Sequence, residues 1–357
     1  MYKISGVDRK NIDAHLDLLE EKARRLMADF RDGKLDFEGS LGRNKAIHFV
    51  FRVIPKSPTW FFLDKYSQSS YLKKLLTGSW KELLEIVDDV NTMMSEKIWK
   101  QKLTKEKYEK RHYQAMKISI DGTIVVDNFN DILRHIFVEE LYEKEFDKYQ
   151  FVKNMNLKVC PYCGRQKINV ASIPNKRVSK PPIDHFLPKS KYPFLAVSFY
   201  NLIPCCTTCN DMANKGEFDP LDGDVGLENP YDFVDGHVRF EGIFPDFDYE
   251  MDEDKYDVNM HFMPLSLSKG YKDSLKLEEF YRDEKTEMID MYSNMIHFSE
   301  GRSESLKAIG IDVAFMNDFQ RRVVGIPLDG KASVRLLYKF KKELFEQLVK
   351  MFHISDS

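Results

Sequence analysis

The sequence predicts a mainly helical α+β protein organised around a central metal site. Apolar residues recur at helical spacing through most of residues 1–150 and again near the C-terminus. Short runs rich in β-branched and aromatic residues, bounded by turn residues, interrupt these helices. All five cysteines lie between Cys160 and Cys209, so the metal site falls between the helical regions.

Residues 1–150 are expected to form a mostly helical N-terminal region. Amphipathic patterns predict helices within three ranges, Ile12–Leu26, Tyr71–Met94 and Ile132–Tyr142. The apolar run Ile47–Phe51 is compatible with a strand or with a buried helical turn. Asp121-Gly122 between two β-rich runs predicts a hairpin over 118–126. The helical stripes are interpreted as core faces rather than as a cofactor site.

Residues 151–232 are expected to form the central metal-binding module, and residues 233–357 a C-terminal region of short strands followed by helices. Val238–Phe247 and Tyr256–Phe262 have the composition of strands, with an acidic loop between them. Lys272–Glu300 and Ser333–Phe352 have the apolar spacing of helices. The sequence contains no internal repeat and no low-complexity tract.

The composition is that of a folded protein, with 43% hydrophobic and 31% charged residues. No apolar run is long enough to cross a membrane, and the first residues do not resemble a secretory signal. Cysteines confined to one stretch, without such a signal, favour metal binding in a reducing cytoplasm over a disulfide framework. We therefore expect a cytoplasmic protein that makes no membrane contact.

Basic residues are concentrated around the cysteines. Between Lys153 and Lys215 there are ten basic and two acidic residues, a formal charge of +8, whereas the whole chain carries −3. This asymmetry suits a polyanionic partner, but a solvated loop explains it equally well. A second stretch, Lys97–Lys117, is basic and aromatic; it could contact a nucleic-acid backbone, although interleaved glutamates favour a solvated helix face.

Two Cys-x-x-Cys pairs predict a structural zinc site. The pairs are Cys160 with Cys163 and Cys206 with Cys209. Four thiolates complete a tetrahedral zinc and leave no position open for water, so this Zn²⁺ is expected to be structural. Cys205 falls outside both pairs and follows apolar residues, so we expect it to be a small buried side chain.

Between and beside these cysteines lies a second set of polar residues. Asp184-His185 is followed by Asn201 sixteen residues after the histidine, and Asn210 comes directly after Cys209. This pattern resembles the ββα-metal core of HNH endonucleases, which often reads Asp-His, then Asn-Leu, then Cys-x-x-Cys-His. Asn210 replaces the final histidine of that pattern, as in the HNN variants of the family. The resemblance covers about 70 residues, from Cys160 to Tyr231.

The resemblance implies a role for each of these residues. His185 would act as the general base that takes a proton from water, because imidazole titrates near neutral pH. Asp184 would point to the other face of the strand and bind Mg²⁺ or Mn²⁺, with the amide oxygen of Asn210 as a second ligand. Asn201 would hydrogen-bond nearby backbone and fix the loop that orients His185. Lys189 and Lys215 are candidates for contacting the phosphate backbone.

The resulting prediction is a metal-dependent HNH endonuclease that hydrolyses phosphodiester bonds, with DNA favoured over RNA as substrate. Asp-His-Phe-Leu-Pro-Lys-Ser at 184–190, with its flanking motifs, is also similar to HNH subunits of bacterial anti-phage systems of the Septu type and their retron-associated relatives. Those subunits pair with an ATPase, so an ATPase partner and a role in antiviral defence are expected. The alternative is a non-catalytic zinc-ribbon module that binds nucleic acid or protein and serves as an adaptor to an ATPase.

Overall fold

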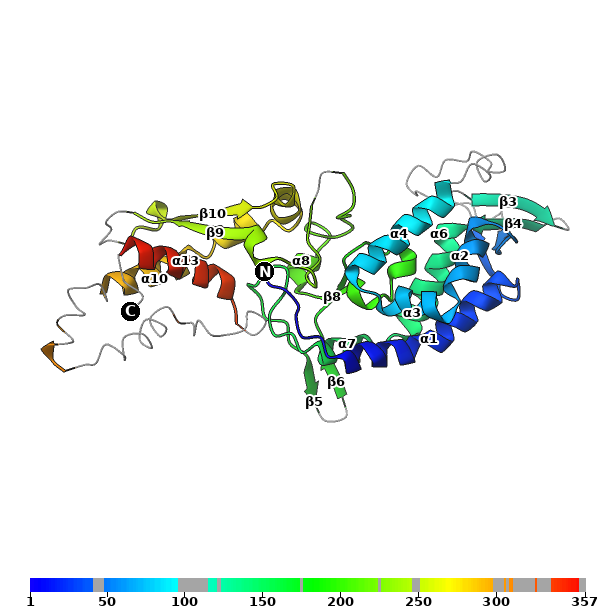
Figure 1. Cartoon of the computed structure of the whole chain (residues 1–357), viewed down its shortest axis with the longest axis horizontal. Coiled ribbons are helices and arrows are strands. Elements are labelled where there is room, and N and C mark those ends of the chain that lie inside the picture. The colour runs from blue at the N-terminus through cyan, green and yellow to red at the C-terminus, as the bar shows by residue number, and fades with distance from the viewer. Residues whose placement is uncertain are drawn as a thin grey trace. The chain divides into compact units, whose positions relative to one another are not determined.

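The computed structural model describes residues 1–40, 48–95, 115–120, 123–173, 176–223, 226–245, 251–297, 305, 308–310, 325 and 335–352. In this part of the chain the fold is α+β with small sheets, as predicted (Figure 1). The chain divides into two compact units. Unit 1 comprises Met1–Ser5, Asn156–Pro182 and Pro204–Ser357, and unit 2 comprises Gly6–Met155 and Ile183–Ile203. Residues of the predicted central module, 151–232, therefore belong to both units.

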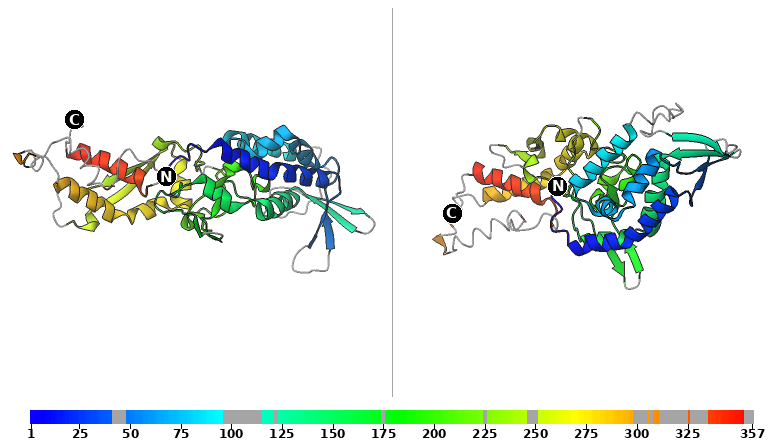
Figure 2. Two further views of the ribbon diagram at one scale, coloured as in Figure 1. Left: turned by 90° about the horizontal axis from the view of Figure 1, so that it is seen from below. Right: turned by 45° about the vertical axis from the view of Figure 1, so that its right-hand side comes forward.

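Unit 2 is built mainly from helices. They are α1 (Arg9–Arg31), α2 (Pro58–Tyr66), α3 (Ser69–Thr77), α4 (Trp80–Ser95), α6 (Phe129–Leu133), the π-helix η1 (Arg134–Glu145) and α7 (Lys148–Met155). Short elements follow in Ile183–Ile203, namely β7 (Ile183–His185), the 3-10 turns η2 (Pro193–Leu195) and η3 (Phe199–Asn201), and the first residues of β8 (Leu202–Pro204). Figure 2 shows α1 running along the other helices of this unit.

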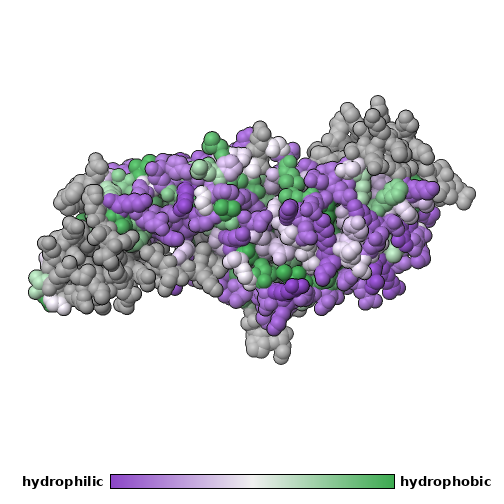
Figure 3. Space-filling view, viewed as in Figure 1, coloured by the Kyte–Doolittle hydropathy of each residue, from purple (hydrophilic) through white to green (hydrophobic). Residues whose placement is uncertain are grey.

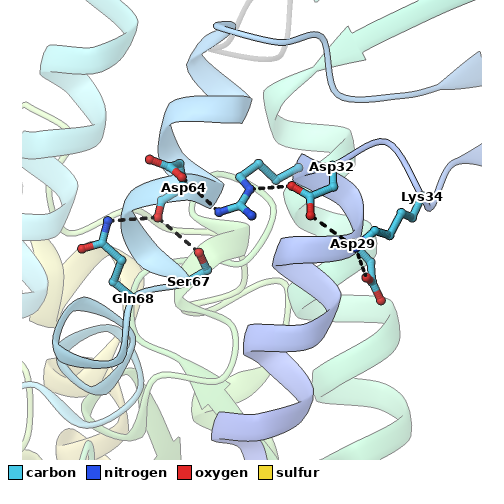
Figure 4. A network of polar contacts seen from close by, with 7 residues as sticks. Asp29, Asp32, Lys34, Asp64, Ser67 and Gln68 are labelled. Carbon is cyan, nitrogen blue, oxygen red and sulfur yellow. Dashed lines mark hydrogen bonds and ion pairs between the residues drawn. The ribbon is translucent and has the colours of Figure 1, made fainter.

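Helix α1 confirms the first predicted amphipathic stripe. It begins after Asp8, whose carboxylate accepts a hydrogen bond from Lys10 N, and it ends before Gly33 with φ +69°. One face, from His15 to Phe30, is buried against α2, α3 and η1. At the C-terminal end, the Arg31 guanidinium donates to Asp32 and to Asp64 of α2, which fixes α2 against α1 (Figure 4).

The second stripe, predicted over Tyr71–Met94, contains a break: α3 ends at Thr77 and α4 begins at Trp80. At Gly78 the backbone passes so close to Lys74 O that a Cβ atom would lie 2.3 Å from it. Ser79 then caps α4, because its Oγ accepts a hydrogen bond from Glu82 N at 3.4 Å while its own backbone N–H donates to Glu82 Oε2 at 2.8 Å. Periodicity alone missed this break because apolar spacing continues across it.

A four-stranded sheet of order β1-β2-β4-β3 completes unit 2. Its strands are β1 (Phe37–Ser40), β2 (His48–Phe51), β3 (Ala115–Ile120) and β4 (Thr123–Asn128). Ile120 pairs with Thr123, which confirms the predicted hairpin. The run at 47–51, for which a strand and a helical turn were both compatible, forms strand β2 in its described residues. The turn itself at 121–122 and most of the Lys97–Lys117 stretch lie outside the described residues. Strands β3 and β4 extend as a ribbon beyond the helices (Figure 2).

Unit 1 combines short hairpins with helices from the C-terminal region. Its elements are β5 (Ala171–Ile173), β6 (Lys176–Ser179), α8 (Thr207–Asn210), η4 (Asp235–His237), β9 (Val238–Ile243), η5 (Glu253–Lys255), β10 (Asp257–Phe262), η6 (Lys269–Ser274), α9 (Leu277–Arg282), α10 (Lys285–His297) and α13 (Tyr338–Met351). The predicted strand pair is present, with Asp257 opposite Ile243. The predicted helix over 272–300 is divided into α9 and α10 in the described part.

The core of unit 1 forms where one face of β9 meets α13. Residues along β9 alternate between buried and exposed, as expected for a strand with one covered face. Glu343 of α13 is buried; it accepts hydrogen bonds from Phe240 N at 2.7 Å and from Lys339 Nζ at 2.6 Å. Gln347 makes a reciprocal pair of bonds with the backbone of Gly242. These polar contacts fix α13 along the strand.

The face drawn in Figure 3 is mostly hydrophilic, with small separate hydrophobic patches. This agrees with the burial of the apolar stripes of α1, α3 and α4 inside unit 2. Of the helices in the described residues, none is both long and apolar enough to cross a membrane.

One buried carboxylate joins the sheet of unit 2 to its helices. Asp127 of β4 accepts hydrogen bonds from Ile54 N at 2.7 Å and from Thr59 Oγ1 of α2 at 2.5 Å. Burial raises the pKa of Asp127 to about 6, although hydrogen bonds from Ser57 and Thr59 act in the opposite direction. The stability of the protein should therefore depend on pH through this group.

The folded-state pKa of about 6 lies above the value of about 3.9 expected for Asp127 in the unfolded chain. Its stabilising contribution is complete below about pH 4 and is lost as the pH rises through about 6, a change of about 3 kcal/mol in the free energy of unfolding. Urea denaturation of Asp127→Asn should show a flatter pH profile over this range than the unmodified protein. Asp36→Asn, at a half-exposed carboxylate, is the control; equal slopes for all three proteins would contradict the assignment.

Candidate active site and metal centre

The predicted site residues follow one another on two short strands and a helix. Strands β7 and β8 pair, and just beyond β7 Phe186 N donates to Asn201 O at 2.9 Å. Asp184 and His185 lie on β7 and Asn201 immediately precedes β8, so these three residues belong to unit 2. Asn210 ends α8, a helix of only four residues, and belongs with the cysteines to unit 1.

The His185 ring contacts a backbone carbonyl through Nε2. Its Nε2 lies 3.0 Å from the carbonyl oxygen of Ala196. A carbonyl can only accept, so this contact places the proton on Nε2, and Nδ1 is the basic nitrogen of the neutral ring. The Tyr142 ring of η1 packs edge-on against the imidazole, with centroids 4.6 Å apart. His185 is 7% exposed, and its orientation is therefore fixed both by a hydrogen bond and by packing.

Asn201 makes the backbone contacts that were predicted for it. Its Oδ1 accepts from Leu187 N at 2.8 Å, and its Nδ2 donates to Leu187 O at 3.2 Å and to Leu195 O at 3.0 Å. The side chain is completely buried. Asn201 thus joins the chain just after β7 to the segment that carries the Ala196 carbonyl. The predicted loop-fixing role is present, and its consequence for catalysis stays a prediction.

A third side chain secures the same segment from α1. His15 Nε2 lies 2.7 Å from Val197 O, so the consecutive carbonyls of Leu195, Ala196 and Val197 each accept from a buried side chain. Burial lowers the pKa of His15 to about 4, against the effect of this hydrogen bond. His15 is therefore a neutral donor at physiological pH. Ser198 adds a further bond from its hydroxyl to Leu75 O at 2.6 Å.

Asp184 occupies the middle of β7 and is 5% exposed. Adjacent residues of a strand point to opposite faces, so the carboxylate is expected on the other side of β7 from the His185 ring. Among the described residues, the only group of three or more His, Cys, Asp or Glu ligands close enough to hold a metal is formed by four cysteines. Among the described residues, an ion at Asp184 would therefore have at most one further His, Cys, Asp or Glu ligand, and amides, water or substrate would supply the others, as is common for Mg²⁺.

Asn210 and Lys215 have surroundings that the sequence did not indicate, and the ligand role of Asn210 stays a prediction. The amide Oδ1 of Asn210, the predicted metal ligand, lies 3.9 Å from the Cys205 thiol, which can donate to it. Lys215 is 1% exposed and is thus poorly placed to reach a phosphate. Lys189, by contrast, has a side chain that is 41% exposed, and its Nζ lies 5.0 Å from the centre of the Tyr142 ring that contacts His185.

Cys160, Cys163, Cys206 and Cys209 come together as predicted. Their sulfur atoms all lie within 4.8 Å of one another, and all four residues are buried. The Cys163 and Cys206 sulfurs are 3.9 Å apart, close to the spacing of about 3.8 Å that Zn–S bonds of about 2.3 Å give in a tetrahedron. A disulfide would need about 2.05 Å. The cluster can therefore hold a metal ion such as zinc.

The local backbone explains how each cysteine pair is positioned. Gly164 adopts φ +67° after Cys163 and donates its N–H to Cys160 O at 2.8 Å, which closes the first knuckle. A side chain there would bring its Cβ to 2.7 Å from Met1 N. The second pair opens α8, where Cys206 accepts at its sulfur from Cys209 N at 3.4 Å.

Backbone N–H groups donate to two sulfur atoms of the cluster. Arg165 N donates to Cys163 Sγ and Cys206 N donates to Cys160 Sγ, each at 3.4 Å. Hydrogen bonds with the Cys160, Cys206 and Cys209 thiols hold the pKa of Cys163 well below its usual value. Burial raises the pKa of Cys160, and hydrogen bonds with the other three thiols raise the pKa of Cys209. Cys163 is therefore better suited than Cys160 or Cys209 to be the thiolate that binds Zn²⁺. Cys205, predicted to lie outside the cluster, is buried and is not one of its members.

Contacts from the C-terminal region hold the first knuckle. Tyr281 of α9 donates its hydroxyl to Cys163 O, and Leu337 N, just before α13, donates to Gly164 O at 2.7 Å. Arg165 pairs with Glu284 at 2.8 Å. These contacts place the knuckle and the C-terminal helices in one unit, a connection that no sequence motif indicated.

Sequence reasoning also missed groups around His185. The Ala196 carbonyl carries no sequence signal because any residue supplies one. Tyr142 was predicted only as part of a helical stripe and Lys148 was not singled out, yet Tyr142 contacts His185 and the Lys148 ammonium lies 4.4 Å from the Tyr142 ring centre. The proximity of Tyr142 and Lys148 to His185 could not be predicted from spacing along the chain, because more than thirty-five residues separate them from His185.

Comparisons of the chain with protein-family models, with curated proteins and with solved structures gave no match. The resemblance to HNH endonucleases therefore rests on the motif residues.

The cysteine cluster predicts a specific pattern of metal loss. Purified protein should contain about one zinc per chain by elemental analysis. Cys206→Ser should remove most of it and lower the thermal midpoint, because metal binding contributes folding free energy. Cys205→Ser changes a neighbouring buried thiol outside the cluster and should keep the metal. Equal metal content in the two variants would contradict the assignment.

Proposed function

We propose that this protein is a metal-dependent HNH endonuclease that hydrolyses phosphodiester bonds of nucleic acid, with DNA favoured over RNA. The observation that supports this most directly is the attachment of His185 Nε2 to Ala196 O, which makes Nδ1 the basic nitrogen. A general base needs a fixed ring and the correct tautomer, and both follow from this bond. The neighbouring carboxylate of Asp184 and the backbone bonds of Asn201 agree with the same role.

In the proposed reaction, His185 Nδ1 accepts a proton from a water molecule as the water oxygen attacks phosphorus. The bond from phosphorus to the leaving oxygen breaks, and that oxygen finally takes a proton from solvent. Asn201 keeps the Leu195–Val197 carbonyls in place, so that the imidazole does not have to reorient as it becomes charged. A preorganised base of this kind avoids a reorganisation cost during the reaction.

A divalent ion is part of the proposal. Asp184 would hold Mg²⁺ or Mn²⁺, and the ion would neutralise charge on the phosphate and on the leaving oxygen. A carboxylate with water is an oxygen-rich donor set that suits these hard ions. Zinc would remain at the cysteines, where four ligands leave no position for catalytic water.

A protein partner and a role in antiviral defence complete the proposal. The resemblance to anti-phage HNH subunits suggests an ATPase as the partner and the cytoplasm as the location. Unit 1 presents apolar side chains that suit such an association: Met263 is 71% exposed and Leu265 80%. The partner would control access of nucleic acid to His185. Copurification with the product of a neighbouring gene, followed by cleavage assays with and without it, tests this part.

One observation favours the alternative function, a non-catalytic zinc module that binds nucleic acid or protein as an adaptor to an ATPase. His185 is only 7% exposed and its ring is packed against Tyr142, as a structural histidine would be. A nuclease needs water at Nδ1, whereas an adaptor does not. The two functions therefore differ in whether any cleavage depends on His185.

Replacing His185 separates these functions. His185→Ala should lower the cleavage rate in Mg²⁺ by about 10²–10⁴-fold, because a general base is lost, while zinc content stays unchanged. His261→Ala, at an exposed histidine of β10, should cleave like the unmodified protein. The assay is run in the presence of any copurifying partner. Equal rates for both variants, or no cleavage by any of the proteins, would contradict the nuclease proposal.

A further inference from the structure

Two lysines of unit 2 meet at one carboxylate beside His185. Lys148 at the start of α7 and Lys189 after β7 both pair with Glu143 of η1, the first with Oε2 and the second with Oε1 at 3.7 Å. Both ammonium groups also lie near the Tyr142 ring, at 4.4 Å and 5.0 Å from its centre. The Tyr142 ring in turn contacts the His185 imidazole.

The arrangement has the geometry of an anion site. Each oxygen of one carboxylate faces a different cation, as the two non-bridging oxygens of a phosphodiester would. Glu143 is 49% exposed on its side chain and Lys189 41%, so the position of the carboxylate can be reached from solvent. Lys148 is more covered, at 22%, which limits the positions its ammonium can take.

The charges favour an anion there. Burial lowers the pKa of Lys189, and the positive charges of Lys148 and Arg134 lower it further. The negative charge of Glu143 acts in the opposite direction and raises this pKa. Burial alone would raise the pKa of Glu143, but the two lysines hold it below its usual value. The Glu143 carboxylate therefore only partly neutralises the positive charge of the lysines. A second anion beside the lysines, or an anion that replaces the Glu143 carboxylate, would also be stabilised there.

We infer that Lys148 and Lys189 form a phosphate-binding site for the nucleic-acid substrate, and that the Glu143 carboxylate occupies the phosphate position until substrate displaces it. This inference rests on the proposed nuclease function and names the group that recognises its substrate. The ligand is a phosphodiester of the nucleic-acid backbone, and the contact carries no base specificity. Glu143 acts as a competitor for the site, which reduces the affinity for nucleic acid in general.

Equilibrium binding of a short fluorescein-labelled DNA duplex tests the site without cleavage. The zinc-loaded full chain is titrated by fluorescence anisotropy, with no added Mg²⁺ or Mn²⁺, over a series of salt concentrations. Lys148→Gln and Lys189→Gln should each weaken binding about twofold to fivefold at low salt. Each should also reduce the slope of log K against log salt by about 0.9. Glu143→Gln should tighten binding about twofold to fivefold.

Two variants with the same charge changes serve as controls. Lys144→Gln replaces an exposed lysine of the same π-helix that pairs with Glu140, and Glu145→Gln replaces a glutamate that pairs with Lys22. Both should bind like the unmodified chain. If Lys148→Gln matches Lys144→Gln, or Glu143→Gln matches Glu145→Gln, the inference is wrong, and the same holds if neither DNA nor RNA duplexes bind. Binding that follows the predicted pattern without any His185-dependent cleavage contradicts only the nuclease proposal.

Discussion

The candidate active site depends on one short stretch of backbone, the carbonyls of Leu195, Ala196 and Val197. Three buried side chains from α1, β7 and η3 donate to these carbonyls, so segments far apart in the sequence meet at consecutive residues. Leaving one such carbonyl without a donor costs about 1–3 kcal/mol, which disfavours any movement of the stretch. The orientation of the His185 ring is therefore a property of the packed unit rather than of a flexible loop.

The metal centre depends on a different set of contacts. Four buried thiols converge because two tight knuckles present them, and the first knuckle is held by Tyr281 and by the backbone before α13. A metal ion there would join segments that are separated by more than forty residues in sequence. These contacts lie within unit 1, whereas the His185 contacts lie within unit 2. The cysteine cluster is therefore held by contacts from the C-terminal region, and the His185 segment by contacts from the N-terminal region.

The sequence predicted those features that local chemistry determines. Spacing identified the four cysteines, and apolar periodicity identified α1. Each of these signals is local, because the residues that make it up lie only three or four positions apart in the chain. It did not reveal the break at Gly78, where a close backbone approach rather than a pattern ends the helix. Nor did it indicate that Lys215 is buried or that Tyr142 contacts His185, since burial and long-range contacts arise only when distant segments pack. The catalytic roles remain predictions.

The hydrogen bond to Ala196 O is proposed to select the reactive tautomer of His185. Nitrogen-15 NMR of histidine-labelled protein, with His185 assigned by its loss in His185→Ala, measures this tautomer directly. The bond predicts a neutral ring that carries its proton on Nε2 and leaves Nδ1 as the basic nitrogen. A neutral ring protonated on Nδ1 would contradict the proposed mechanism, because the nitrogen proposed to accept the proton from water would already hold one.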